Sequence, residues 1–138
     1  MRILGLDLGT KTLGVAISDN LGIIASKYDV IRFNEEDYDE ALKKLMPIIS
    51  EFNITTVVLG LPKNMNNTLG FASQRSLAFK EKLEKENINV ILQDERLSSV
   101  EANNVLIKGN MSRRKRKEEV DALAATIILQ SYLDRKEN

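Results

Sequence analysis

The sequence contains no cysteine, no histidine and no tryptophan. Without cysteine and histidine, the chain can form no disulfide framework, zinc finger, thiol nucleophile or Ser-His-Asp triad. Aromatic residues make up only 5% of the chain, which argues against an aromatic stacking platform for single-stranded nucleic acid. The chemistry that remains is that of carboxylates, hydroxyls, lysine, arginine and hard metal ions held by oxygen.

Targeting and membrane signals are also missing. The N-terminus has no signal-peptide pattern, and no apolar run is long enough to span a bilayer. We therefore expect a cytoplasmic protein that does not enter the membrane. The 138 residues suit one compact domain, 1–138, and the 20 basic and 20 acidic side chains cancel to a net charge of zero. Affinity for phosphates is thus expected to be local, near the basic run RRKRK at 113–117.

Hydrophobic periodicity and turn signals predict a mixed α/β fold. The first three strands are joined by short turns, which favours an antiparallel meander, and later strands alternate with helices, which favours parallel pairing. We expect helices on both faces of the sheet. The predicted strands are 2–8, 13–19, 23–33, 55–60 and 88–93, and the predicted helices are 35–52 (with Pro47 as a possible break), 70–86, 99–108 and 117–133.

Acidic residues occur at three places in the chain where secondary-structure propensity alone would not put them. Asp7 lies inside the first strand, Asp94 and Glu95 directly follow the strand 88–93, and Asp121 lies at the mouth of an apolar helix. Each has an ordinary explanation: a turn hydrogen bond, a solvated strand end, or a favourable charge at a helix N-terminus. Together they indicate a convergent carboxylate cluster, the ligand set that Mg²⁺ or Mn²⁺ requires here.

The basic run is predicted as a loop before the last helix. A cationic loop is usually a solvated surface. Here it leads into Asp121, so it also suits a phosphate backbone bound beside a metal site. Gly109 and Asn110 at its start suggest that it closes over substrate.

Four motifs resemble those of the YqgF-type family of RNase H-like proteins, also known as Holliday junction resolvases or pre-16S rRNA nucleases. They are GLDLGTKTLGVAISD at 5–19, VVLGLPKNMNNT at 57–68, QDERLSSVEA at 93–102 and KEEVDALAA at 117–125. They occur in the family's order over almost the whole chain. The resemblance implies an RNase H-like fold and cleavage of a phosphodiester with two metal ions.

By motif, Asp7, Glu95 and Asp121 match the family's catalytic and metal-binding acids. The resemblance implies that Asp7 bridges two Mg²⁺ or Mn²⁺ ions, about 3.5–4 Å apart, and that the other two acids complete their coordination. One ion would activate water and the other would stabilise the leaving oxygen. Asp94 is then a partner of the metal ligands.

The same resemblance predicts the residues that contact substrate phosphates. These are Lys11, Asn64, Arg96, Arg113, Arg114, Lys115, Arg116 and Lys117. Two positions depart from the family pattern. Asn66-Asn67 stands where the family usually has Asp-Gly, and Thr12 where it often has Arg. These differences bear on substrate contacts and leave the carboxylates intact.

The resemblance implies maturation of the 5′ end of pre-16S ribosomal RNA, with ribosomal particles as partners. The alternative is resolution of four-way DNA junctions, which requires a homodimer that cuts symmetrically. The sequence does not distinguish a monomer from a homodimer. The DLGT segment also resembles the phosphate loop of sugar kinases and actin-like ATPases, but these close two such domains around ATP. A non-catalytic binding module is the remaining alternative.

Overall fold

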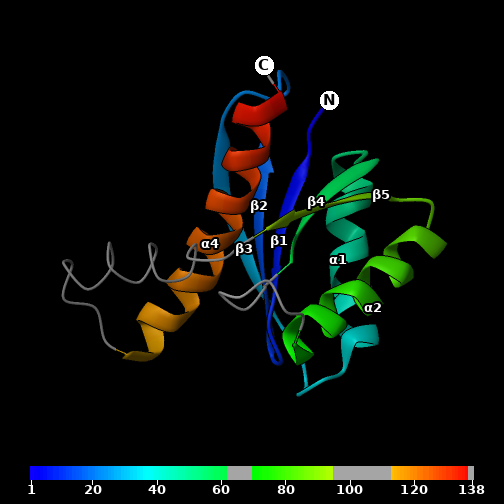
Figure 1. The fold of residues 1–138 in the computed structure, drawn as a ribbon, viewed down its shortest axis with the longest axis vertical. Helices are drawn as coiled ribbons and strands as arrows, with labels where there is room; N and C mark the ends of the chain where they lie inside the picture. The colour runs from blue at the N-terminus through cyan, green and yellow to red at the C-terminus, as the bar shows by residue number, and fades with distance from the viewer. Residues whose placement is uncertain (62–69, 95–112, 137–138) are drawn as a thin grey trace.

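The computed structural model describes residues 1–61, 70–94 and 113–136 (Figure 1). The predicted helix 99–108 lies outside these residues. The described elements are β1 (Leu4–Leu8), β2 (Thr12–Ser18), β3 (Ala25–Arg32), α1 (Tyr38–Glu51), β4 (Thr56–Leu61), α2 (Phe71–Lys85), β5 (Asn89–Asp94) and α4 (Arg113–Lys136). Within this part of the chain, no helix combines the length and apolar character needed to cross a bilayer.

The five strands form one sheet in the order β3-β2-β1-β4-β5. β1, β2 and β3 are antiparallel neighbours, whereas β4 runs parallel to β1, and β5 parallel to β4. Leu6 of β1 lies opposite Leu59 of β4, which in turn lies opposite Leu92 of β5. The predicted meander followed by parallel strands is confirmed. Short turns allow only antiparallel pairing, and α1 and α2 supply the crossovers that parallel strands need.

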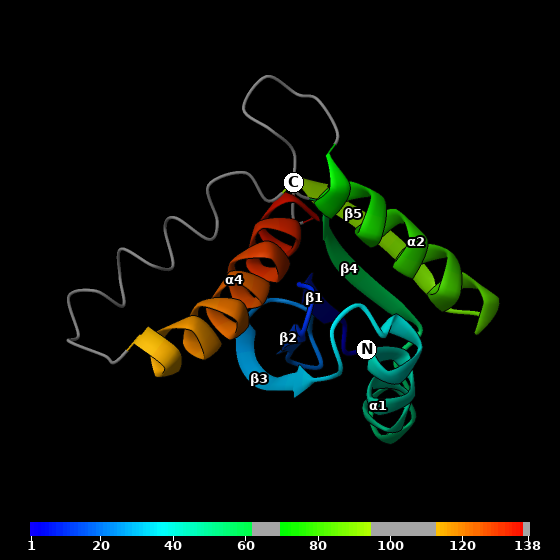
Figure 2. The same cartoon turned by 90° about the horizontal axis from the view of Figure 1, so that it is seen from below.

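Helices cover both faces of the sheet, as predicted (Figure 2). On one face, Leu4, Leu6 and Leu8 of β1 pack in a core with α1 and α2. On the other face, Ile3 packs with the buried residues of α4, among them Leu129. Because successive side chains of a strand point to opposite faces, Gly5 and Asp7 share the α4 face with Ile3.

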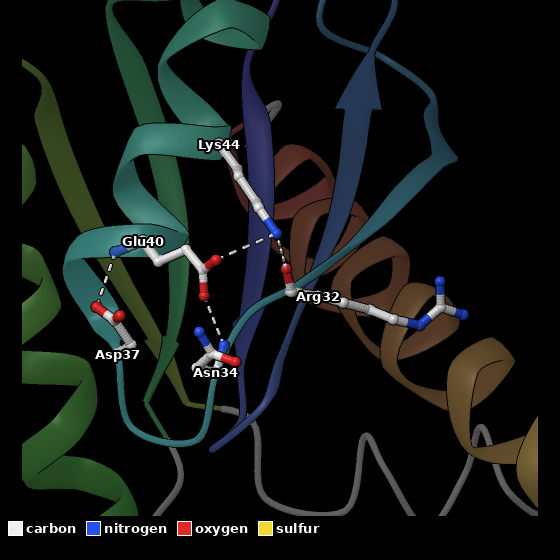
Figure 3. Close-up of polar contacts among 5 residues, drawn as sticks. All are labelled: Arg32, Asn34, Asp37, Glu40 and Lys44. Atoms are coloured by element: carbon white, nitrogen blue, oxygen red, sulfur yellow. Dashed lines mark hydrogen bonds and ion pairs between the residues drawn. The ribbon is translucent and has the colours of Figure 1, made fainter.

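The start of α1 is fixed by side chains that bond the backbone (Figure 3). Asp37 caps the helix by accepting a hydrogen bond from the Glu40 N–H at 3.1 Å. Glu40 reaches back to accept the Asn34 N–H at 2.6 Å, and this bond holds the pKa of its carboxyl below the usual value. Lys44 donates to the Arg32 carbonyl at 2.6 Å. The N-terminus of α1 is thereby tied to the end of β3.

The predicted basic loop is wrong. Residues 113–117 form the first turns of α4, so this helix begins at Arg113 and not at Lys117. Lysine and arginine are good helix formers, and nothing in RRKRK breaks a helix. The helix also continues to Lys136, beyond the predicted end at Leu133.

One other helix detail differs from expectation. Pro47 does not interrupt α1, because it lies on the exposed face, where water can take the place of the missing hydrogen bond. The buried face of α2 is formed by Ser73, Ser76, Phe79 and Leu83, whereas Ala78 is exposed. Two serines therefore occupy positions that a purely apolar pattern would miss.

The third strand is shorter at its start than the predicted 23–33. Asp19 accepts hydrogen bonds from the N–H groups of Ile23, at 2.7 Å, and Ile24, at 3.1 Å. These bonds hold the two residues in the turn between β2 and β3, and they lower the pKa of the Asp19 carboxyl. The strand itself begins at Ala25.

Candidate active site

Asp7 is the next-to-last residue of β1 and is half-buried on the face that α4 covers. Its partner on the neighbouring strand β2 is Gly14, which has no side chain. On the other side, Leu6 pairs with Leu59, so the next position of β4 beside Asp7 is Gly60. The Asp7 carboxylate is therefore flanked on both neighbouring strands by glycine positions. Glycine inside a strand often marks a place where another group approaches closely.

Helix α4 lies unusually close to β1 at Gly5. A Cβ atom placed on Gly5 would lie 2.6 Å from the Leu129 Cβ and 2.8 Å from the Ala125 carbonyl oxygen. Ile3, two residues earlier in β1, shares its cluster with Leu133, later in α4. The helix therefore runs antiparallel to β1, and its earlier residues lie toward Asp7.

This packing sets the register of Asp121. From Gly5 to Asp7 the strand advances about 6.8 Å. From Ala125 back to Asp121, one turn earlier on the same stripe of α4, the helix advances about 6 Å. The backbone position of Asp121 is thus expected at the level of Asp7. Asp121 also lies eight residues after the first residue of α4, so the helix-end explanation for it is wrong, because the dipole effect fades within the first turn.

The end of β5 adds a second strand terminus to this edge of the sheet. Asp94 is the last residue of β5 and pairs with Leu61, the last residue of β4. Gln93 before it is buried. The carboxyl ends of β1, β4 and β5 therefore meet at one edge, where α/β sheets commonly bind ligands. Glu95, Arg96 and Asn64 lie outside the described residues.

The turn after Asp7 is well anchored. The Gly9 N–H donates to the Thr12 carbonyl at 2.8 Å. The carbonyls of Thr10 and Lys11 accept hydrogen bonds from the Glu36 and Phe33 N–H groups, at 2.8 and 2.9 Å. The Lys11 side chain is exposed. The structure thus presents an exposed lysine on the turn that follows Asp7, and this turn is tied to the segment before α1.

The turn after Asp7 lies at the same end of the molecule as the starts of three helices. The β1–β2 turn and the first residues of α1, α2 and α4 all lie at the lower end in Figure 1. The residues Arg113–Lys117 continue the axis of α4 beyond Asp121, away from the sheet (Figure 2). No group of three acidic side chains that could hold a metal ion occurs among the described side chains. Those of Glu95 and Asp121 are not part of that set.

Sequence reasoning predicted a carboxylate cluster but missed the strand glycines that lie near Asp7. Gly5, Gly14 and Gly60 all lie on strands, and glycine within a strand is the signal that could have found them. It also missed Arg75 on α2, whose buried Nε has no hydrogen-bond partner among the described residues. That feature depends on the packing of α2 and has no sequence signature.

Comparison with known proteins gives consistent results. A family model described as "RuvX: Holliday junction resolvase" matches residues 1–135. A protein of Geobacillus sp. strain WCH70 named "Putative pre-16S rRNA nuclease" is 51% identical over 138 residues, covering 99% of this chain and 100% of the relative. A protein of the same name from Staphylococcus haemolyticus is 50% identical over 135 residues, covering 96% and 95%.

A solved structure has the same fold at low sequence identity. The fowlpox virus resolvase, in complex with Holliday junction DNA, superposes with a TM-score of 0.62 at 17% identity and covers 100% of both chains. Likeness at this identity concerns the fold, which is RNase H-like, as the motifs implied.

Proposed function

Because the chain belongs to the RuvX family, the family its four motifs resemble, we propose that it is a metal-dependent nuclease that cleaves the precursor of 16S ribosomal RNA. The observation that carries this proposal is Asp7, held on the α4 face between two glycine positions. The close packing at Gly5 supports a backbone position of Asp121 at the same level. The names of relatives at about half identity over nearly the whole chain support the RNA substrate.

Asp7, Glu95 and Asp121 are the residues we assign to the metal. Their donors are hard carboxylate oxygens, which fit Mg²⁺ or Mn²⁺, and the chain has no histidine or cysteine to favour a softer ion. Gly14, the neighbour of Asp7 on β2, has no side chain that could occupy the space beside the carboxylate. Two divalent ions held there would stabilise the charge that develops on the phosphate during hydrolysis.

The remaining assigned residues bind and orient the substrate. Lys11 projects from an anchored turn next to Asp7 and is placed to contact a phosphate. Arg113–Lys117 form a cationic helix segment leading to Asp121, and they would bind the backbone electrostatically, without reading sequence. Asn64 and Arg96 are assigned to substrate contact from their motifs. We also propose that ribosomal particles are partners of the protein, and that it acts as a monomer or a homodimer.

A second candidate substrate is a four-way DNA junction. It is favoured by the description of the family model and by the likeness to a resolvase fold. This function requires two active sites that cut symmetrically, so it requires a homodimer. Cleavage of either substrate would use the same carboxylates. The RNA and the DNA junction differ in the contacts that they would make with the protein around this site.

The test compares wild type with Asp7→Asn on a 5′-extended 16S precursor RNA and on a four-way DNA junction. Each substrate is incubated with Mg²⁺, Mn²⁺ or EDTA. Asp29→Asn is the matched control, because Asp29 is an exposed aspartate on the edge strand β3. We expect metal-dependent cleavage of the RNA by wild type and by the control, and none by Asp7→Asn or in EDTA.

The alternative outcomes are distinct. Paired symmetric nicks in the junction, without RNA cleavage, would favour the resolvase. Equal cleavage by wild type and Asp7→Asn would contradict the assigned role of Asp7. No cleavage of either substrate under any condition would contradict the nuclease assignment for the chain alone.

A further inference from the structure

Three buried polar atoms in the described structure have no hydrogen-bond partner. They are the Tyr38 hydroxyl, the Arg75 Nε and the Ser76 Oγ. Buried polar groups are nearly always hydrogen-bonded, and each exception needs a physical explanation. Two of these atoms are on adjacent residues of α2, and the third is at the first residue of α1. They therefore mark one region, the start of α1 and the second turn of α2.

Arg75 is the most unusual of the three. It is half-buried, and no hydrogen bond or ion pair to it occurs within the described residues. A charge taken partly out of water is costly unless it is paired. Lys82, seven residues later on the same helix, shows the ordinary arrangement, because its Nζ lies 2.6 Å from Asp39 Oδ1. Among the described residues, Arg75 thus has no anion that compensates for the desolvation of its charge.

The surroundings of Arg75 favour an anion. The first turn of α2 has no acidic residue, and its N-cap Gly70 provides no side-chain hydrogen bond. The backbone N–H groups there carry the positive end of the helix dipole. The second polar group, Ser76, is only 1% exposed and likewise unpartnered. An anion bound near the first turn of α2 would therefore meet the helix dipole and the Arg75 charge, with no acidic side chain of that turn opposing it.

Tyr38 lies within electrostatic range of Arg75. Burial raises the pKa of the Tyr38 phenol, the positive charge of Arg75 lowers it in part, and Glu36 and Glu35 raise it further. The ring packs edge-on against Phe33, with centroids 5.8 Å apart. The phenol therefore stays protonated at neutral pH, and its hydroxyl is a hydrogen-bond donor held in a fixed place.

Arg75 and Tyr38 lie close to the candidate active site, but on the opposite face of the sheet. Phe33, against which Tyr38 packs, donates its backbone N–H to the Lys11 carbonyl in the turn after Asp7. Asp7 itself faces α4, whereas α1 and α2 cover the opposite face. A nucleic-acid strand crossing the edge at Lys11 would therefore reach from the carboxylates to Arg75.

We propose that Arg75 and Tyr38 form a second phosphate-binding site, which holds the substrate backbone on the α1–α2 side of the active site. The inference rests on the proposed nuclease function, which supplies the phosphodiester. The guanidinium offers only donors and matches two phosphate oxygens in one plane, and the protonated phenol beside it has one further O–H that can donate. A phosphate bound at the accessible part of the half-buried Arg75 side chain would neutralise its charge, which has no ion-pair partner among the described residues.

The experiment measures binding separately from cleavage. Arg75→Gln, Tyr38→Phe and the matched control Lys82→Gln are each made in the Asp7→Asn background. Their affinities for the precursor RNA and for the four-way junction are measured at several salt concentrations. Thermal unfolding of each variant is measured without nucleic acid.

We expect Arg75→Gln to weaken binding about tenfold and to reduce the magnitude of the salt slope of log K by about 0.7–0.9. Tyr38→Phe should weaken binding by about threefold, and Lys82→Gln should bind within a factor of two. Arg75→Gln should not lower the melting temperature, because it removes an unpaired charge. With Asp7 restored, Arg75→Gln should raise KM and leave kcat nearly unchanged.

Unchanged affinity and salt slope in Arg75→Gln would overturn the proposal, as would an equal loss in Lys82→Gln. A lower melting temperature with normal binding would show a structural role instead. Binding without cleavage by wild type would contradict the nuclease function while the Arg75 comparison still holds. Absence of binding to either nucleic acid would contradict both.

Discussion

The contact between Gly5 and α4 yields the sharpest prediction of the structure. In Gly5→Ala, the new Cβ would meet the Leu129 Cβ at 2.6 Å and the Ala125 carbonyl oxygen at 2.8 Å. Carbon atoms pack best at about 3.5–4.0 Å, so the helix must withdraw from β1 by about 1 Å. Neither obstacle is the end of a flexible side chain, since one is a Cβ and the other is backbone.

The expected loss of stability follows from this misfit. Overpacking a core costs about 1–3 kcal/mol, and replacing glycine recovers about 0.4–1 kcal/mol by restricting the unfolded chain. With the middle of each range, the net loss is about 1.3 kcal/mol. With an unfolding entropy of about 2.1 cal/mol/K per residue, the melting temperature of this 138-residue chain should fall by about 4–5 °C. Thermal unfolding followed by circular dichroism measures it.

The same displacement should impair catalysis. Asp121 lies one turn from Ala125 on α4, so withdrawing the helix moves it relative to Asp7. A misplacement of about 1 Å can cost as much as a hundredfold in rate, and we expect a loss of at least tenfold in cleavage at 25 °C, where the variant is still folded.

Gly22→Ala is the control for stability alone. Gly22 has a φ of 71° in the turn between β2 and β3, at the other end of the sheet from Asp7. An alanine in this conformation costs about 1 kcal/mol, and cleavage should remain normal. Wild-type stability in Gly5→Ala would refute the close packing. Lower stability with normal cleavage would refute the claim that this packing positions the site.

Two further predictions concern residues outside the site. Asp37→Ala removes the cap of α1 and should lower the free energy of unfolding by about 1 kcal/mol, measured by urea titration; a change below a few tenths would mean that water replaces the cap. Asp19 accepts two backbone N–H bonds that lower its folded pKa, so its contribution is complete above the unfolded pKa and is lost as pH falls through the folded pKa. Between pH 7 and pH 3, wild type should therefore lose more stability than Asp19→Asn, and equal losses would contradict this reading.

Much of the fold could be predicted from sequence because its signals are local. The short turns after Leu8 and Ser18 allow only an antiparallel meander, and helix-period patterns between the later strands require parallel pairing. The prediction that the basic run at 113–117 is a loop is also wrong for a local reason. Charge suggested a loop, but helix propensity prevailed over charge repulsion in residues 113–117.

Other features depend on contacts between distant residues, and the sequence does not reveal them. The close approach at Gly5 requires knowing that α4 lies on β1, more than a hundred residues away. The environment of Arg75, which has no ion-pair partner in the described part of the chain, depends on what α1 brings beside α2. Of the proposed metal ligands, Asp7 has a described environment, Asp121 has a backbone position, and Glu95 stays a prediction from its motif.

The tripeptide Gly5-Leu6-Asp7 shows how the site and the core are linked. Alternation along the strand sends Leu6 into the core beneath α1 and α2 and turns its two neighbours toward α4. The glycine admits the helix to within contact of the backbone, and the acid stands about one helical turn further along the seam. Ala125 and Asp121 repeat the same order on α4, a small residue at the contact and an acid one turn beyond. The packing that fixes the helix therefore also fixes which residue of α4 has its backbone at the level of Asp7. A substitution at the contact should then be felt in catalysis, whereas one of equal cost at Gly22 should not.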